Sequence, residues 1–168
     1  MKNWLFRLEA VNEKAGQLFA WSTSLMVWLI CLDVLMRYLF NYTLIWIIEL
    51  ETYFFAIAIM MAGGYAFKHD KHVRVDLFYS KYSAKKKAWI NLLGGLFLLL
   101  PWSLISSYVC FYYFMKSVKI GESSPQAGGL PALYLLKFIL FAGFLLLVLQ
   151  AVASIMKSLL IIKPEESP

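Results

Sequence analysis

The chain has 168 residues and a formal net charge of +6, with 61% hydrophobic and 15% charged residues. A soluble domain carries about a quarter charged residues, so this composition excludes an ordinary soluble protein. The basic excess does not indicate a nucleic-acid partner. The basic residues lie between apolar stretches and lack the aromatic stacking platforms that nucleic-acid binders combine with charge.

At the N-terminus, residues 1–14 place Trp4, Leu5, Leu8 and Val11 at helical spacing, with charged residues elsewhere. This pattern fits an amphipathic helix on the membrane surface before the first span. A frayed start of the chain is the alternative.

Four uncharged stretches determine the expected fold class. Three of them reach or exceed the roughly 18 residues that mark a spanning helix. The second reaches that length if its helix begins near residue 43 and carries Glu49 and Glu51 into the bilayer. The sequence therefore predicts an all-α membrane protein, with residues 1–168 forming a single membrane domain. The four transmembrane helices are expected near 15–36, 43–67, 88–114 and 132–157.

The basic residues predict the orientation of these helices. Seven of the 16 lysines and arginines lie in 68–87, and cytoplasmic loops accumulate such residues. We therefore expect the 68–87 loop and both termini to be cytoplasmic, and the connections 37–42 and 115–131 to be periplasmic. The loop lysines are expected to set this orientation and to bind the headgroups of membrane lipids; they include Lys81, Lys85, Lys86 and Lys87.

Four ionisable residues lie in or near the predicted spans, where burying a charge is unfavourable. They are Asp33, Arg37, Glu49 and Glu51. Each costs about 2.5–3.5 kcal/mol near the bilayer centre unless it has a partner. Asp33 and Arg37 share a helix face, being four residues apart. The short connection brings Glu49 back to a similar depth, and Glu49 and Glu51 point to nearly opposite sides, so one of them can face Arg37.

Three interpretations of this charge cluster remain: helix packing, an ion or proton path, and contact with a second subunit. We favour packing over an ion path, because the four groups gather at one end and no chain of carboxylates crosses the bilayer. Contact with a second subunit is the hypothesis for the carboxylate that does not meet Arg37.

No pattern of catalytic or metal-binding residues is apparent. His69 and His72 are the two histidines, and both lie in the 68–87 loop, which argues against haem ligation inside the bilayer. His72 and Asp76 form an HxxxD pair, which supplies too few ligands for a metal. We therefore predict a protein that is not an enzyme, with no cofactor, metal or substrate site of its own.

Three segments of the sequence, taken together, resemble a known family. They are RYLFNYTLIWIIELETYFF (37–55), AGGYAFKHDKHVRVDLFYSKYS (62–83) and IGESSPQAGGLPALYLLKFILFAGFLLLVLQ (120–150). They resemble the DctQ family, the small membrane subunit of tripartite ATP-independent periplasmic (TRAP) transporters. The positions that carry the shared pattern are Arg37, Trp46, Glu49, Gly63, Gly64, His72 and Asp76.

The resemblance implies a multi-pass protein of a bacterial or archaeal inner membrane. In such symport systems a periplasmic solute-binding protein captures the solute, commonly an organic acid, and a large many-spanning permease subunit moves it with a sodium gradient. The small subunit would scaffold the large one and help dock the binding protein. His72 and Asp76 would fix the turn between the second and third spans, and Trp46, Gly63 and Gly64 would serve structure or the subunit interface.

Two other functions remain as alternatives. One is a stand-alone four-helix channel or exporter, which would need a polar stripe along a pore, whereas the third and fourth spans carry scattered polar residues. The other is the anchor subunit of a respiratory membrane complex. Missing intramembrane histidines count against haem in such an anchor and leave quinone open.

Overall fold

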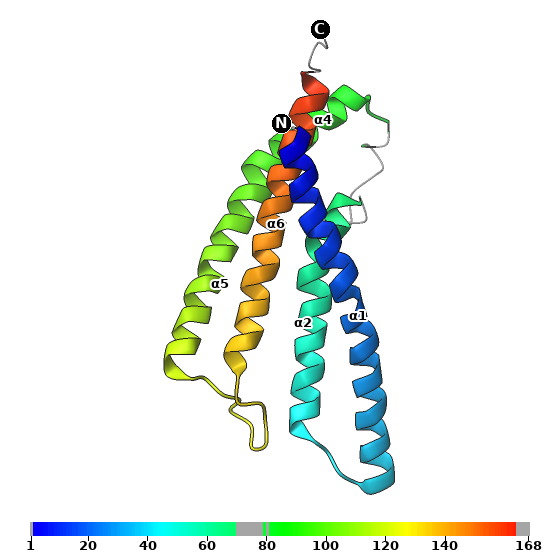
Figure 1. Ribbon diagram of the computed structural model, residues 1–168, viewed down its shortest axis with the longest axis vertical. Coiled ribbons are helices and arrows are strands. Elements are labelled where there is room, and N and C mark those ends of the chain that lie inside the picture. Colours follow the sequence, from blue (N-terminus) through cyan, green and yellow to red (C-terminus); the bar gives the residue numbers. More distant parts are fainter. Residues whose placement is uncertain (1, 70–78, 80, 164–168) are drawn as a thin grey trace.

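The computed structural model describes residues 2–69, 79 and 81–163, and no strand occurs among them. Four helical stretches are long and apolar enough to cross a membrane. This confirms the expected all-α fold with four spans. The elements are α1 (Lys2–Phe40), α2 (Ile45–Lys68), α4 (Ala84–Gly94), the π-helical turn η1 (Gly95–Leu99), α5 (Leu100–Ile120) and α6 (Leu133–Ile162) (Figure 1).

Helix α1 runs without a break through the segment in which a separate surface helix was expected. The reason lies in its contacts with the end of α2. Asn12 is fully buried, and the Glu13 carboxylate accepts hydrogen bonds from Lys68 and His69. The stretch around Asn12 and Glu13 therefore packs on α2 as part of one long helix, while Trp4 and Phe6 before it are exposed.

The third span is one helical run made of α4, η1 and α5. Proline 101 lies in the first turn of α5, where its missing N–H can be tolerated. Just before it, the Leu100 N–H bonds to the Gly95 carbonyl, five residues earlier. The third span thus contains a single widened turn just before Pro101, which is how π-helical segments usually occur.

Helix α6 contacts α1, α2, α4, η1 and α5. Helix α1 packs mainly on α2, and α5 packs mainly on α6. Close approach is provided by glycines, as is usual between membrane helices. A Cβ added to Gly143 of α6 would lie 2.6 Å from the Met60 Cβ and 2.8 Å from the Met60 carbonyl oxygen on α2. Gly16 of α1 likewise lies directly against Tyr65 of α2.

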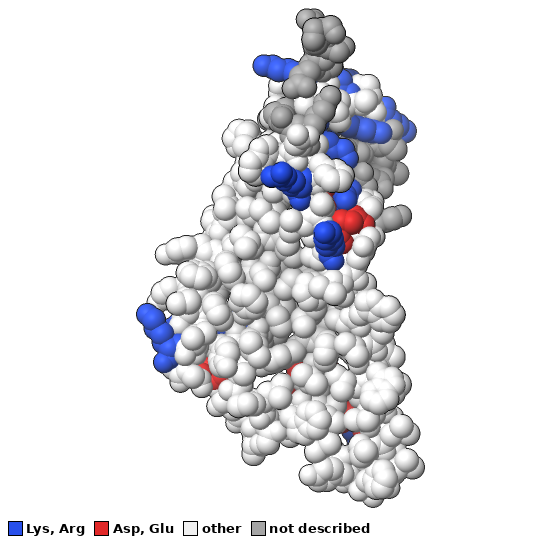
Figure 2. All heavy atoms as spheres, in the orientation of Figure 1, with Lys and Arg blue, Asp and Glu red and all other residues white. Residues whose placement is uncertain are grey.

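The first turns of α1 and the last turns of α6 lie at the same end of the bundle (Figure 1). Figure 2 shows most of the visible basic side chains gathered at this end, and an uncharged band between the two ends. Large apolar side chains such as Trp21, Trp28 and Phe97 are exposed along the helices. Such a surface suits contact with lipid tails or with other apolar helices.

Candidate functional site

The first cluster of ionisable residues lies near the ends of α1 and α2 that are remote from the chain termini. Arg37 donates a hydrogen bond from Nη2 to Oδ2 of Asp33, one helical turn earlier. The Asp33 side chain is 6% exposed and that of Arg37 is 51% exposed. The second carboxylate oxygen of Asp33 has no hydrogen-bond partner among the described residues.

Glu51 belongs to the same cluster from the side of α2. Its carboxylate lies within electrostatic range of Asp33 and Arg37. Its Oε1 atom is buried and has no hydrogen-bond partner in the part of the chain that the structure describes. Glu51 therefore retains an acceptor that no described group uses.

Glu49 points to a different part of the molecule, the loop of residues 121–132, called here the α5–α6 loop. Its carboxylate accepts a hydrogen bond from the Ser124 hydroxyl and another, 2.6 Å long, from the Leu130 backbone N–H. A Cβ added to Gly129 would lie 2.7 Å from Glu49 Oε1, so the glycine lets the loop backbone approach the carboxylate. Glu49 thus organises the loop from inside the helical bundle.

Further bonds close the α5–α6 loop on itself. Gly121 ends α5 in the left-handed conformation, with φ +59°, which glycine adopts without strain. The Ser124 N–H bonds to the Leu130 carbonyl at 3.0 Å. Glu122 forms an ion pair with Lys137 at the start of α6, and this hydrogen-bonded lysine holds the pKa of the Glu122 carboxyl below its usual range.

The other end of the bundle is tied together by Glu13 of α1. Its Oε2 atom lies 2.8 Å from Lys68 Nζ and 2.8 Å from His69 Nε2, at the end of α2. The His69 ring also lies against Tyr65, with ring centroids 4.4 Å apart. These contacts fix the point at which α2 ends and the 68–87 loop begins.

Of the family-pattern residues that remain, the structure describes Trp46, Gly63 and Gly64 but not His72 and Asp76. Trp46 is exposed in the first turn of α2. Gly64 lies against the buried Asn12, whereas a Cβ on Gly63 would meet nothing within 4 Å. His72 and Asp76 lie outside the described residues, so their expected role in the turn remains a prediction.

The loop lysines lead into α4. Ser83 caps this helix by accepting a hydrogen bond from the Lys86 backbone N–H, and Lys85, Lys86 and Lys87 lie in its first turns. The Lys87 ammonium lies 5.4 Å from the centroid of the Tyr79 ring, a cation–π distance. Lys81 is exposed just before the helix.

Sequence reasoning did not find the contacts made by Ser124, Glu122 and Glu13. Each joins residues that are far apart along the chain, from 15 residues for Glu122–Lys137 to 75 for Ser124–Glu49. One feature of the sequence could have indicated the Glu122–Lys137 contact. These two residues have opposite charges and lie on either side of a loop that contains Gly and Pro. No group of three or more potential metal ligands occurs among the described residues.

The fold and these clusters define an integral membrane protein whose charged groups organise its two ends and whose middle is apolar. The model of the family described as tripartite ATP-independent periplasmic transporters, DctQ component, matches residues 26–160. Because this match covers well over half of the chain, the protein belongs to that family of transporter components and is a multi-pass protein of the inner membrane. No curated protein and no solved structure matches the chain.

Proposed function

We propose that this chain is the accessory small permease subunit of a sodium-driven, binding-protein-dependent secondary transporter for organic acids. In this role it scaffolds a large many-spanning permease subunit and helps dock a periplasmic solute-binding protein. The observation that carries the proposal is the distribution of charge: Lys, Arg, Asp and Glu cluster at both ends of the bundle and are absent from 15–32, 52–67, 88–115 and 138–156. Figure 2 shows the uncharged band on one face.

A site for an organic anion and sodium needs polar groups near the bilayer midplane, commonly at broken helices. In this chain the buried hydroxyl of Ser103 donates to the Leu100 carbonyl of its own helix. The Ser22 hydroxyl likewise donates to the Phe19 carbonyl. These polar groups satisfy local backbone and offer little to a solute, which favours an accessory role over a self-contained transporter.

The exposed surface of the bundle supports a role in assembly. Among the described residues, the buried apolar side chains are few and several are small, including Ala88, Ala151 and Ala153. Much larger side chains, such as Trp28 and Trp102, remain exposed. A scaffold subunit would cover part of this surface with the helices of the large subunit.

The α5–α6 loop is the proposed docking platform for the binding protein. The positive-inside rule assigns the lysine-rich 68–87 loop and both termini to the cytoplasm. The opposite end, with Glu49, Ser124 and Leu130, then faces the periplasm, from which a binding protein approaches. The bonds from Glu49 would hold the loop in one conformation, which reduces the entropy lost on docking.

Co-purification tests this proposal. The chain would be tagged in its native membranes, gently solubilised, and its partners identified by mass spectrometry. We expect a much larger many-spanning protein in stoichiometric amount. A homo-oligomer with no such partner would contradict the proposal and favour a stand-alone channel or exporter.

The transport function itself is tested by reconstitution. The complex would be placed in proteoliposomes with its binding protein and offered a panel of labelled organic acids. We expect uptake that requires an inward sodium gradient and the binding protein together. Uptake that persists without sodium would contradict the sodium coupling, and uptake by this chain alone would contradict the accessory role.

A further inference from the structure

A polar cavity of about 100 Å³ lies at the end of the bundle that holds the chain termini, where α1, α2, α4 and α6 meet. Charged side chains of both signs and amide side chains line this cavity. Together they come from all four helices. The polar residues that matter here are Glu9, Lys68, Asn91, Gln150, Lys157 and Ser158.

Gln150 lines this cavity with an unused acceptor. The residue is 3% exposed, and its Oε1 atom has no hydrogen-bond partner among the described residues. A buried acceptor left without a donor is unfavourable. The cavity therefore offers a place for a hydrogen-bond donor that the described protein does not supply.

The charged residues of the cavity differ in whether they have an ion-pair partner. Lys68 already pairs with Glu13. Lys157 has no ion-pair partner among the described residues, and neither does the Glu9 carboxylate. Considering the described residues alone, the cavity thus has one cation without an ion-pair partner, the exposed Lys157, and two unused acceptors, those of Glu9 and Gln150. This arrangement matches a ligand that carries an anionic group beside a donating cation.

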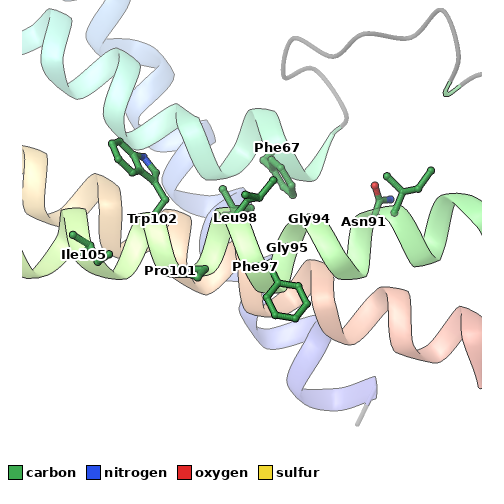
Figure 3. A pocket seen from close by; sticks show the side chains of 11 residues that line it. Phe67, Asn91, Gly94, Gly95, Phe97, Leu98, Pro101, Trp102 and Ile105 are labelled. Carbon is green, nitrogen blue, oxygen red and sulfur yellow. The ribbon is translucent and has the colours of Figure 1, made fainter.

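A larger apolar groove, with a volume of about 670 Å³, lies next to the polar cavity and shares Phe67 and Asn91 with it. Figure 3 shows Phe67 of α2 on the side of the third span that carries Gly94 and Leu98, with Pro101 and Trp102 further along. A side chain at Gly94 would meet nothing within 4 Å, so this position is part of the hollow. The groove runs along the membrane-spanning part of the helix, at the depth of acyl chains.

We propose that these two hollows form a phospholipid-binding site, with the headgroup in the polar cavity and an acyl chain along the apolar groove. The headgroup class is a phosphate linked to a protonated amine. Its phosphate pairs with Lys157, and its ammonium donates to Gln150 Oε1 and to the Glu9 carboxylate. The lipid fills the space between α2 and the third span and so joins two elements of the bundle.

Water is the competing occupant of the polar cavity, which has room for several molecules. Water would satisfy Gln150 equally well, but it would not occupy the apolar groove. If a phospholipid is bound, a substitution in the apolar groove should also weaken binding beside Gln150. If water is bound, such a substitution should have no effect there.

The test uses the purified full-length chain, delipidated in detergent and titrated with defined lipids under native mass spectrometry. Phosphatidylethanolamine, phosphatidylcholine and phosphatidylglycerol of the same acyl chains serve as probes. We expect phosphatidylethanolamine to bind about tenfold more tightly than phosphatidylcholine, whose quaternary ammonium cannot donate hydrogen bonds. Phosphatidylglycerol binding as tightly as phosphatidylethanolamine would overturn the assignment of the amine.

Two substitutions probe the headgroup and one probes the acyl chain. Lys157→Met and Gln150→Leu should each weaken phosphatidylethanolamine binding about tenfold. Gly94→Leu should weaken binding to a similar degree by filling the groove. Gly63→Leu is the matched control, because it is also a helical glycine with open space around its Cβ but lines neither hollow.

Circular dichroism and melting of the lipid-free variants would show that each one folds. Unchanged lipid binding in Gly94→Leu would overturn the proposal and leave water in the polar cavity. Loss of a co-purifying protein in Gly94→Leu with lipid binding unchanged would also overturn it, and would assign the groove to a helix of a partner subunit.

Discussion

The Leu130 backbone N–H donates a 2.6 Å hydrogen bond to the carboxylate of Glu49, 81 residues earlier in the chain. The same carboxylate accepts from Ser124, so one acidic side chain of α2 holds both arms of the α5–α6 loop. This accounts for an acidic residue in the second turn of an otherwise apolar span. Charge at this position is compensated by donors from a loop.

Replacing Glu49 with Gln should loosen the loop. Glutamine keeps the shape but loses the charge that strengthens both bonds, and the loss is about 1–2 kcal/mol. Hydrogen exchange should become faster in 121–131, and the melting temperature in detergent should fall. Gln126→Ala is the control, because the Gln126 side chain is exposed in the same loop. Equal exchange in the two variants would show that Glu49 does not hold the loop.

Arg37→Met should destabilise the packing of α1 on α2, because it leaves the nearly buried Asp33 carboxylate unpaired. We expect a loss of about 1–3 kcal/mol, between the values for exposed and buried pairs. The double variant Asp33→Asn, Arg37→Met should recover much of the loss, since it removes the uncompensated charge. Thermal unfolding in detergent measures both. A double variant no more stable than Arg37→Met would contradict this account.

Gly143→Ala should separate α6 from α2. The added Cβ would lie 2.8 Å from the Met60 carbonyl oxygen, so backbone has to move, and overpacking costs about 1–3 kcal/mol. Gly63→Ala is the matched control: it adds the same methyl group where nothing lies within 4 Å, and alanine is the better helix former by about 1 kcal/mol. The two substitutions should therefore shift the melting temperature in opposite directions.

The sequence predicted what depends on composition and local spacing. Uncharged length identified the spans, and the four-residue spacing of Asp33 and Arg37 placed them on one helix face. The partner of Glu49 could not be predicted, because it depends on how two distant segments meet. Whether Glu49 or Glu51 faces Arg37 likewise depends on the rotation of α2 about its axis, which periodicity alone does not fix.

The packing of the first part of α1 could not be predicted from the sequence for a different reason. An amphipathic pattern over residues 1–14 is the same whether the polar face meets water or another helix. The structure shows that α1 meets α2 there, through Asn12 against Gly64 and Glu13 against Lys68. A polar residue buried at a helix contact resembles an exposed polar residue in the sequence, so this packing was missed.

The Glu122–Lys137 ion pair should make stability depend on pH. The folded-state pKa of Glu122 is lowered, chiefly by the Lys137 hydrogen bond. The stabilisation is therefore fully present above the unfolded carboxyl pKa and is lost as pH falls through the lower folded pKa. Melting temperatures of the parent and Lys137→Met should differ at neutral pH and converge in acid.

Replacing Lys85, Lys86 and Lys87 with Glu should disturb insertion or orientation, because the positive charge of the 68–87 loop sets topology. Cysteines introduced at Tyr82 and Gln126, after Cys31 and Cys110 are changed to Ser, would report the two ends of the bundle. In the parent we expect a membrane-impermeant reagent added to cells to label Gln126→Cys and not Tyr82→Cys. The triple Glu variant should lower this difference or reduce the amount of inserted protein. Labelling of Tyr82→Cys from outside in the parent would place the loop in the periplasm and contradict the proposed orientation, and with it the α5–α6 loop as the docking platform.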